Sequence, residues 1–387
     1  MRIVMDRKPK ILFLFSDTGG GHRSAAESII EAIHLEFPDQ YETKMIDIFR
    51  EYAPLPLNFA PEIYPHLSRY PRMWKIGYKL SDEPKRMKIF YDAMWPYLRR
   101  AVHNLFRENQ VDLMVSVHQL VNIPLMRARL KNNVKFVTVV TDLVSTHSSW
   151  YHPGADLVIV PTIPAKEKAL RNGLPIEKIQ VIGQPIADKY LRRSKSKIEL
   201  RESFGWEQDL ITILLVGGGE GMGNLEQHAY AINQSKLPVQ LVIVAGRNQA
   251  LKQKLENEKW KFPVHVYGFV DQMPEFMQAA DILLTKAGPG TISESFIAGL
   301  PLLLYSRMPG QEDGNIGYVV NQNAGYWVPD PGQMINCLKK WVDKPEELIK
   351  VAARSKQLAK PNASREIARE LIWQISPSDV NRTWISV

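Results

Sequence analysis

Short apolar runs alternate with helical patterns along the first half of the chain. Continuous apolar segments, typical of strands buried on both faces, occur at 10–15, 44–48, 112–117, 135–140, 156–160 and 179–182. Between them, apolar residues recur at helical spacing in 23–36, 85–107 and 164–172. This alternation predicts a parallel sheet with helices on both faces. The segment 52–84 is rich in Pro and aromatic residues, and we expect a loop or short helices there.

The alternation restarts after a strongly charged stretch at 190–209, a composition shift typical of a domain boundary. Strands are predicted at 210–216, 239–245, 264–267, 281–285 and 301–305, and helices near 224–235, 248–258, 273–279, 291–299 and 362–375. We therefore expect an α/β fold of two doubly wound domains, 1–190 and 191–360, and a C-terminal bridging helix and tail at 361–387. Open parallel sheets bind ligands at the carboxyl ends of their strands, so the functional residues are expected to line one cleft.

The composition narrows the class of protein. A chain of 387 residues has room for two cores, and its single cysteine, Cys337, excludes an internal disulfide framework and a cysteine-rich metal site. The first ten residues are too polar for a signal peptide, and no apolar run approaches the roughly 20 residues of a spanning helix. We expect a cytoplasmic protein that is not integral to a membrane.

The positive charge is concentrated in the first half of the chain. Residues 1–195 hold 29 Lys+Arg and 20 Asp+Glu, a net charge of +9, whereas the remainder has a net charge of −1. Within residues 69–107, ten basic residues are interleaved with Tyr, Trp, Phe and Met. This composition suits an anionic membrane surface. A nucleic-acid surface and a solvated helical face with its aromatic residues in the core are the competing interpretations. We favour the membrane and expect no nucleic-acid partner.

Three glycine-rich turns follow predicted strands and precede predicted helices, a position that offers N–H groups and partial positive charge to a phosphate. The first contains Gly20 and Gly21 and leads to His22, which is either a helix cap, a phosphate contact or a catalytic base. The second spans Gly217–Gly223. The third spans Thr285–Glu294, where Glu294 is either an ordinary first-turn acid or a carboxylate that grips vicinal hydroxyls. A polar loop with Gln311 and Glu312 follows the strand at 301–305.

Polar residues also follow two strands of the first domain. His118 follows the strand at 112–117, and Asp142, His147, Trp150 and His152 follow the strand at 135–140. Three histidines and an aspartate allow a zinc interpretation, but neither an HExxH nor a cysteine spacing accompanies them, so we expect no metal.

Together, the segments GGGHR, TDL with its following His and Trp, GGGEGMG, AGRN, TKAGPGTISE and PGQE resemble the monogalactosyldiacylglycerol synthases, lipid glycosyltransferases of family 28, over roughly residues 10–345. The resemblance implies a GT-B fold of two Rossmann-like domains that face a cleft. It also implies a UDP-sugar donor, most specifically UDP-galactose, a diacylglycerol acceptor, inversion at the anomeric carbon, and peripheral attachment to the membrane. Because helix N-termini and glycine turns can stabilise the departing diphosphate, we expect the transfer to need neither a metal nor a cofactor.

For the donor, the resemblance implies a site in the second domain. Uracil is expected against Gly268, Phe269 and Val270, and ribose on Glu294. The sugar hydroxyls are expected on Gln311 and Glu312 with Asn315 in support, while Arg247 is either in the donor pocket or in a domain-closing salt bridge. The diphosphate is expected on the two turns that contain Gly217, Gly218, Gly219, Met222, Gly223, Lys286, Ala287, Gly288, Gly290 and Thr291.

For the acceptor, the resemblance implies a site in the first domain. His22 would be the catalytic base, and Asp142 would orient His22 or the acceptor hydroxyl. Gly20, Gly21, His118, His147 and Trp150 would line the acceptor side of the cleft. Glucosyl transfer, an isomerase or hydrolase that acts on the UDP-sugar without lipid, and a non-catalytic UDP-sugar sensor remain alternatives at this point.

Overall fold

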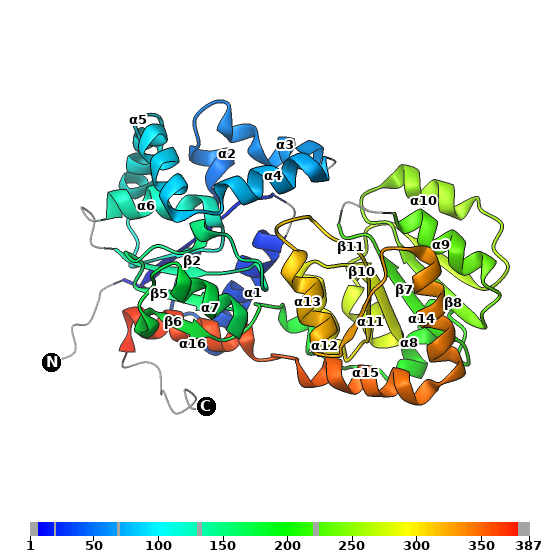
Figure 1. Ribbon diagram of the computed structural model, residues 1–387. Helices are drawn as coiled ribbons and strands as arrows, with labels where there is room; N and C mark the ends of the chain where they lie inside the picture. Colours follow the sequence, from blue (N-terminus) through cyan, green and yellow to red (C-terminus); the bar gives the residue numbers. More distant parts are fainter. Residues whose placement is uncertain (1–6, 19–20, 68–69, 130–133, 220–223, 378–387) are drawn as a thin grey trace. The chain divides into compact units, whose positions relative to one another are not determined.

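The chain forms two compact α/β units, each built around one parallel sheet (Figure 1). The computed structural model describes residues 7–18, 21–67, 70–129, 134–219 and 224–377. The first unit comprises residues 1–188, 309–311 and 362–387, and the second comprises 189–308 and 312–361. The expectation of an α/β fold with two doubly wound sheets is confirmed.

The first sheet has six parallel strands in the order β2-β1-β3-β4-β5-β6. Successive side chains of a strand point to opposite faces, and β1 shows this directly. Phe13 belongs to the same core cluster as α1 and α16, whereas Leu12 and Leu14 belong to the cluster that contains α5, α6 and α7. The strands are β1 (Lys10–Phe15), β2 (Glu42–Asp47), β3 (Leu113–Ser116), β4 (Lys135–Val139), β5 (Leu157–Val160) and β6 (Ile179–Val181), and the helices are α1 (Gly21–Glu36), α5 (Pro84–Glu108), α6 (Asn122–Arg129), α7 (Ile163–Arg171) and α16 (Ala363–Ile375).

A largely helical insert lies between β2 and β3. The prediction of short helices for 52–84 is confirmed, because this segment contains a 3-10 turn and two helices of eight and eleven residues. Asp47 caps the first helix of the insert by accepting from the backbone N–H groups of Phe49 and Arg50. The elements are α2 (Ile48–Tyr52), η1 (Leu57–Phe59), α3 (Ala60–Leu67) and α4 (Pro71–Ser81), followed by α5.

The second sheet has six parallel strands in the order β12-β11-β10-β7-β8-β9. Its strands are apolar and mostly buried, as expected for a sheet covered on both faces. The strands are β7 (Ile211–Val216), β8 (Val239–Val244), β9 (Val264–Tyr267), β10 (Ile282–Lys286), β11 (Leu302–Ser306) and β12 (Gly325–Trp327), and the helices are α8 (Lys197–Phe204), α9 (Leu225–Gln234), α10 (Gln249–Glu256), α11 (Met273–Ala279), α12 (Pro289–Ala298), α13 (Asp313–Asn321), α14 (Pro331–Asp343) and α15 (Pro345–Gln357).

The last described helix belongs to the first unit. Ile367, Leu371 and Ile372 of α16 are fully buried in the same cluster as α1. The hydroxyl of Ser364 donates to the carbonyl of Ile186 at 2.7 Å and accepts from the Ile186 N–H at 2.9 Å. The C-terminal segment therefore completes the core that the N-terminal strands begin.

Most predicted strands and helices occur in the structure with ends shifted by one to three residues. Several elements were not predicted, among them α6, α8, and all elements between 313 and 360. The segment 190–209, interpreted as a charged boundary, contains α8, which begins with a capping box formed by Ser196 and Glu199. A charged surface helix and a linker have similar compositions, so composition alone did not separate them.

Candidate active site

His22 lies in the first turn of α1 and is held there by its Nδ1 atom. This atom is 2.8 Å from the carbonyl oxygen of Val117, just after β3, and 2.9 Å from Oγ1 of Thr141, just after β4. A carbonyl oxygen only accepts hydrogen bonds, so Nδ1 carries the proton and Nε2 carries the lone pair. Burial lowers the pKa of His22 to about 4, although the hydrogen bond to Val117 opposes this shift. The imidazole is therefore neutral at neutral pH and has a basic nitrogen available.

A second neutral histidine packs against the first. The rings of His22 and His118 lie edge to face with their centroids 4.6 Å apart. Nδ1 of His118 accepts from the backbone N–H of Leu120, so its Nε2–H donates to Oγ1 of Thr18 at 3.0 Å. Burial, followed by the proximity of His22, lowers the pKa of His118 well below its usual value. Two protonated imidazoles at this separation would repel each other, so the pair remains uncharged.

Asp142 and Trp150 form a buried pair beside the histidines. Trp150 Nε1 donates to Oδ2 of Asp142 at 2.7 Å, and both side chains are almost completely buried. The ring of Trp150 lies 6.2 Å from that of His22. Nδ1 of His22 is held by Val117 and Thr141, and these two residues were missed by sequence reasoning. The expectation that Asp142 orients His22 or the acceptor hydroxyl stays a prediction. Thr141 is adjacent to Asp142 in the TDL segment. This position at the end of a predicted strand was the one signal in the sequence that could have identified Thr141 as a site residue.

The remaining first-unit candidates lie close by. His147 is buried, with Nδ1 2.7 Å from Oγ of Ser149 and Nε2 3.1 Å from Oγ of Ser81. Gly21 is exposed at the start of α1, and a Cβ added there would meet no atom within 4 Å. His152 is half-buried, and its Nδ1 accepts from the backbone N–H of Gly154. Gly20 lies outside the described residues.

An apolar pocket of about 200 Å³ opens beside the histidine pair. One of its lining residues, Phe49, packs edge-on against His118 with ring centroids 5.6 Å apart. The wall of the pocket therefore contacts the ring of His118, which in turn packs on His22. Its lining is formed by α2, η1, α5 and the segment that follows His118, namely Ile48, Phe49, Tyr52, Ala53, Leu57, Phe90, Tyr91, Met94, Leu98, Ala101, Val102, Leu120, Val121, Pro124 and Leu125.

In the second unit, two glycine turns pack on each other at the carboxyl ends of β7 and β8. Gly246 has φ +61°, and a Cβ there would lie 2.5 Å from the carbonyl oxygen of Gly219. The N–H of Arg247 donates to that same oxygen at 2.9 Å. Only glycine permits this close approach, so the AGRN segment fixes the described part of the 217–223 turn. Gly217 lies in that described part, whereas Met222 and Gly223 lie outside the described residues.

The side chain of Lys286 extends from the end of β10 past two glycine turns, which contain Gly218 and Gly288. Its Cε would lie 3.3 Å from a Cβ at Gly218, and its Nζ 3.5 Å from a Cβ at Gly288. Its ammonium group forms an ion pair with Glu312 at 2.7 Å, and the second oxygen of Glu312 accepts from the N–H of Met308 at 2.6 Å. A positive charge is thus held between two turns that each precede a helix, α9 and α12.

Several other predicted donor residues lie in three separate elements. Asn315 Nδ2 donates to the carbonyl of Ala287 at 2.9 Å, which joins the start of α13 to the end of β10. Gly290 and Thr291 lie in the first turn of α12. Gln311 lies in the 309–311 segment, which is grouped with the first unit.

Glu294, on α12, forms a side-chain hydrogen bond with the hydroxyl of Tyr190, a residue that sequence reasoning missed. Burial raises the pKa of Glu294 to about 7, opposed by Tyr190 and by the charge of Lys189. Tyr190 belongs to the charged boundary segment, where no motif marks it.

The Gly268–Val270 segment follows β9. The guanidinium of Arg247 stacks on the exposed ring of Phe269, 4.7 Å from its centroid. Arg247 therefore touches both the 217–219 turn and the segment expected to receive uracil.

Two further properties concern metals and membranes. Among the described residues, no group of three or more His, Cys, Asp or Glu side chains is arranged to hold a metal ion. Within the same part of the chain, none of the helices combines the length and apolar character needed to cross a bilayer.

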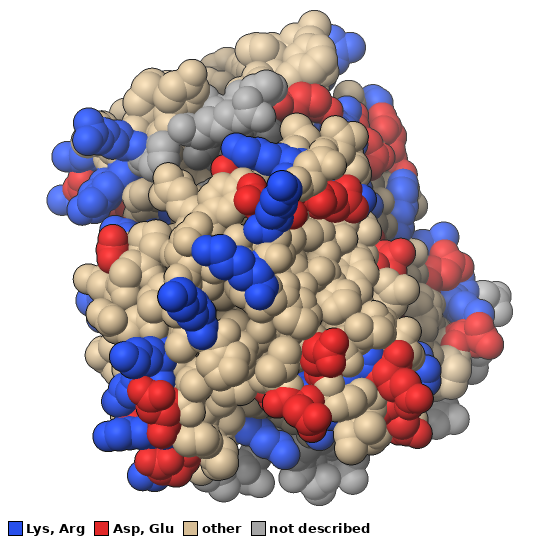
Figure 2. Space-filling view, turned by 90° about the vertical axis from the view of Figure 1, so that its right-hand side faces the viewer, with Lys and Arg blue, Asp and Glu red and all other residues tan. Residues whose placement is uncertain are grey.

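The exposed charges of the molecule are not distributed uniformly along the chain. On the face shown in Figure 2, Lys and Arg side chains lie among Asp and Glu side chains. The insert differs, because α4 and α5 combine many basic residues with exposed apolar side chains. These exposed side chains are Tyr70, Met73, Ile76, Leu80, Ile89, Phe90 and Tyr97.

Comparisons with known proteins agree with this geometry. Residues 22–186 match the family described as monogalactosyldiacylglycerol (MGDG) synthase, and residues 212–370 match the glycosyltransferase family 28 C-terminal domain. The chain is 36% identical over 384 residues to monogalactosyldiacylglycerol synthase 2, chloroplastic, of Arabidopsis thaliana, covering 96% of this chain and 82% of that protein. It is 38% identical over 387 residues to the probable monogalactosyldiacylglycerol synthase 2, chloroplastic, of Oryza sativa subsp. indica, with the same coverage.

Among solved structures, Staphylococcus aureus MnaA with UDP superimposes with a TM-score of 0.63 at 16% identity, covering 95% of this chain and 96% of that one. This likeness concerns the fold alone, which is the GT-B fold. The sequence match extends over nearly the whole chain and includes both the histidine turn and the glycine-rich turns. The chain therefore belongs to the monogalactosyldiacylglycerol synthase family of glycosyltransferases.

Proposed function

We propose that the protein transfers galactose from UDP-galactose to the free hydroxyl of 1,2-diacylglycerol, with inversion at the anomeric carbon. The observation that carries this proposal is the buried, neutral His22, whose Nδ1 proton is engaged by Val117 and whose ring system adjoins an apolar pocket. A base next to an apolar pocket suits an acceptor that presents a hydroxyl on a hydrocarbon body. Membership of the family supports the same donor and acceptor.

In the proposed reaction, His22 Nε2 removes the proton of the acceptor hydroxyl while the oxygen attacks the anomeric carbon of galactose. The bond between this carbon and the diphosphate breaks, and its electron pair leaves with UDP. The ammonium of Lys286 and the N-termini of α9 and α12 would stabilise the departing negative charge, so the transfer needs no metal ion. In this assignment the first unit supplies base and acceptor site and the second unit holds the donor.

The apolar pocket is assigned to an acyl chain of the acceptor. Its lining is almost entirely hydrocarbon and aromatic, and Phe49 connects it to His118. An acyl chain placed there is withdrawn from water, and burial of each methylene contributes about 0.8 kcal/mol. The hydroxyl end of the same molecule would then lie toward the histidine pair.

The function is tested with four incubations: UDP-galactose or UDP-glucose, each with and without diacylglycerol in anionic vesicles, followed by thin-layer lipid analysis. We expect a new glycolipid with UDP-galactose and diacylglycerol together. A glycolipid formed with UDP-glucose and diacylglycerol, but not with UDP-galactose, would show that the donor sugar is glucose. Sugar release or isomerisation without lipid would contradict the transferase and indicate a hydrolase or an isomerase.

Replacement of the proposed base should abolish turnover without loss of donor binding. His22→Gln should lower kcat by about 10²- to 10⁴-fold, the usual contribution of a positioned general base. The affinity for UDP, measured by calorimetry, should stay near that of the wild type. Retention of kcat would remove His22 as the base.

The pH profile provides an independent check on His22. The neutral ring is the active form, and burial lowers the pKa of His22 to about 4, so protonation sets in only near that pH. At saturating UDP-galactose, which removes the pH dependence of donor binding, the acidic limb of kcat/KM for diacylglycerol should therefore lie near pH 4 rather than near 6.5. Stability at each pH is verified by return to pH 7.5. An acidic limb near 6.5 would contradict the buried neutral imidazole.

Glu294 is assigned to the ribose hydroxyls, which donate best to an ionised carboxylate. Since burial raises the pKa of Glu294 to about 7, the wild type should bind UDP-galactose more tightly at pH 8 than at pH 6. Glu294→Gln should lose about tenfold or more in affinity and show no such pH dependence. Glu346→Gln, on the exposed first turn of α15, is the matched control. Equal affinity in Glu294→Gln and wild type would exclude the ribose assignment.

The basic and apolar surface of the insert is proposed to dock on an anionic membrane, with the protein held peripherally. The triple change Lys88→Glu, Arg99→Glu and Arg100→Glu should weaken flotation with anionic vesicles by about 100-fold or more, since each basic residue near the surface contributes about 1 kcal/mol. The control places the same charge change on the second unit, with Lys339→Glu, Lys344→Glu and Lys350→Glu, all at exposed positions. Equal binding by both triple variants would place the docking surface elsewhere.

A further inference from the structure

Helix α4 of the insert presents different residues on different faces. Met73, Ile76 and Leu80 follow one another at helical spacing and are exposed, with 56–70% of each residue accessible. On another face lie Tyr78 and Ser81, followed by Asp82 at the C-terminal end. The exposed face suits the membrane surface proposed above, whereas the other face contacts the loop 145–149 of the same unit. One short helix thus joins two environments.

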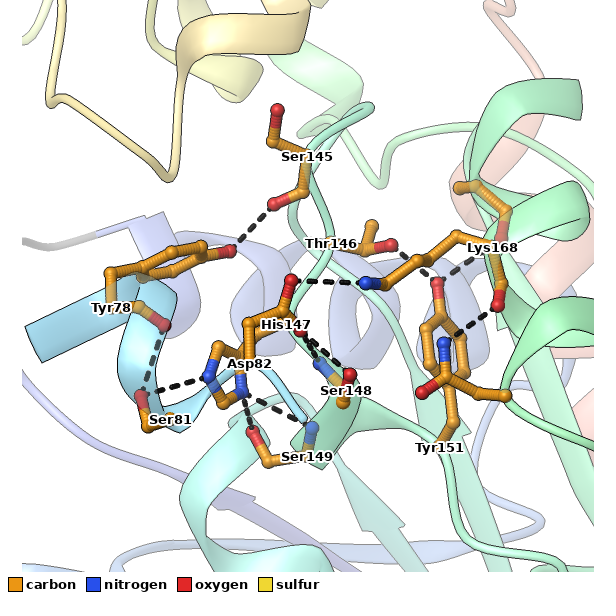
Figure 3. A network of polar contacts seen from close by, with 12 residues as sticks. Tyr78, Ser81, Asp82, Ser145, Thr146, His147, Ser148, Ser149, Tyr151 and Lys168 are labelled. Atoms are coloured by element: carbon orange, nitrogen blue, oxygen red, sulfur yellow. Dashed lines mark hydrogen bonds and ion pairs between the residues drawn. The ribbon is translucent and has the colours of Figure 1, made fainter. Parts of the chain in front are cut away.

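Three side chains at the C-terminal end of α4 hold the loop 145–149 that leads to Trp150 (Figure 3). The hydroxyl of Tyr78 donates to the carbonyl of Ser145 at 2.6 Å. Oγ of Ser81 donates to a carbonyl of its own helix and accepts from Nε2 of His147 at 3.1 Å, because Nδ1 of His147 accepts from the N–H of Ser149. The loop is therefore attached to α4 at three successive points, the third of which is Asp82.

Asp82 forms the strongest of these attachments. Its Oδ1 accepts from both the backbone N–H and the hydroxyl of Ser148, each at 2.7 Å, and its Oδ2 accepts from Nζ of Lys168 on α7 at 2.9 Å (Figure 3). A carboxylate at the C-terminal end of a helix interacts unfavourably with the helix dipole. Asp82 therefore does not stabilise α4 through the helix dipole. Its contacts with Ser148 and Lys168 are what favour an acid at this position.

The loop that Asp82 holds carries the residues next to the base. Two residues after Ser148, Trp150 donates to the carboxylate of Asp142, and the ring of Trp150 lies 6.2 Å from that of His22. On its other side the loop is held by Asn122, whose Nδ2 donates to the carbonyls of Ser149 and Trp150. A shift of this short, buried segment would move Trp150 and disturb its hydrogen bond to Oδ2 of Asp142, whose Oδ1 accepts from Nε2 of Gln311 at 3.0 Å.

We propose that Asp82 is a positioning residue for the acceptor reaction: by fixing the 145–149 loop to α4 and α7, it sets Trp150 and the Asp142 carboxylate beside His22. This inference rests on the proposed galactosyl transfer to diacylglycerol. It makes α4 a single rigid connection between the membrane surface and the loop beside the base. Removal of the Asp82 carboxylate detaches the loop 145–149 from α4 but leaves the exposed face of α4 unchanged. Membrane binding is therefore retained and turnover is lost.

The test compares Asp82→Ala and Asp82→Asn with the wild type in vesicle flotation, in kcat, and in KM for UDP-galactose, at 20 °C. Asp82→Ala should lower kcat by about 10- to 100-fold, as expected for misplacement of groups near the reacting atoms. Flotation and the KM for UDP-galactose should stay within about twofold of wild type, because the exposed face of α4 and the second unit are unchanged. Asp82→Asn keeps an oxygen for Ser148 and should recover part of kcat.

Glu167→Ala and Glu167→Gln are the matched controls, since Glu167 is an exposed acid on α7, next to Lys168, with only a weak ion pair to Arg171. They should leave all three readouts unchanged. If Asp82→Ala has the kcat of the controls, or loses flotation in proportion to kcat, the proposal is wrong. If Asp82→Ala does not fold, wild-type kcat in both Asp82→Asn and Ser148→Ala overturns it. Absence of glycolipid with the wild type would overturn the proposed function itself.

Discussion

The hydrogen bond from His22 Nδ1 to the carbonyl of Val117 joins the start of α1 to the end of β3, and it sets the arrangement of the polar groups around it. This carbonyl lies one residue beyond β3, while the N–H of Val117 still pairs with Leu14 of β1. A buried carbonyl outside the strand ladder requires a donor, and the imidazole supplies it. The same bond excludes the tautomer that would place the proton on Nε2.

The order of strands in the first sheet explains why these groups meet. β1, β3 and β4 are neighbours in a parallel sheet, so the segments that follow them emerge at the same edge. They carry Thr18 and His22, then Val117 and His118, then Thr141 and Asp142. The second unit repeats the principle, since Gly246 after β8 packs on the turn after β7 and Lys286 ends the adjacent β10. In both units the chemistry lies where adjacent parallel strands end.

Local patterns in the sequence were sufficient to place every strand except β12. β1 matches the predicted run 10–15, because an uninterrupted apolar run between polar segments has few alternatives to a buried strand. The partners of His22 were not predictable in this way, since Val117 and Thr141 lie 95 and 119 residues away and their identity depends on the strand order. Nothing local in the sequence indicates the contact of Asp82 with Ser148, which is 66 residues away. Tyr190 was missed for the same reason.

The return of α16 to the first unit has a consequence for synthesis of the chain. Ile367, Leu371 and Ile372 complete the core around α1 and β1, yet they are translated after every residue of the second unit. Domains generally fold in the order in which they leave the ribosome. Here the N-terminal core stays open on one face until α16 emerges, so the second unit is complete in sequence before the first. Until then the apolar face of α1 lacks the cover that α16 provides in the folded protein.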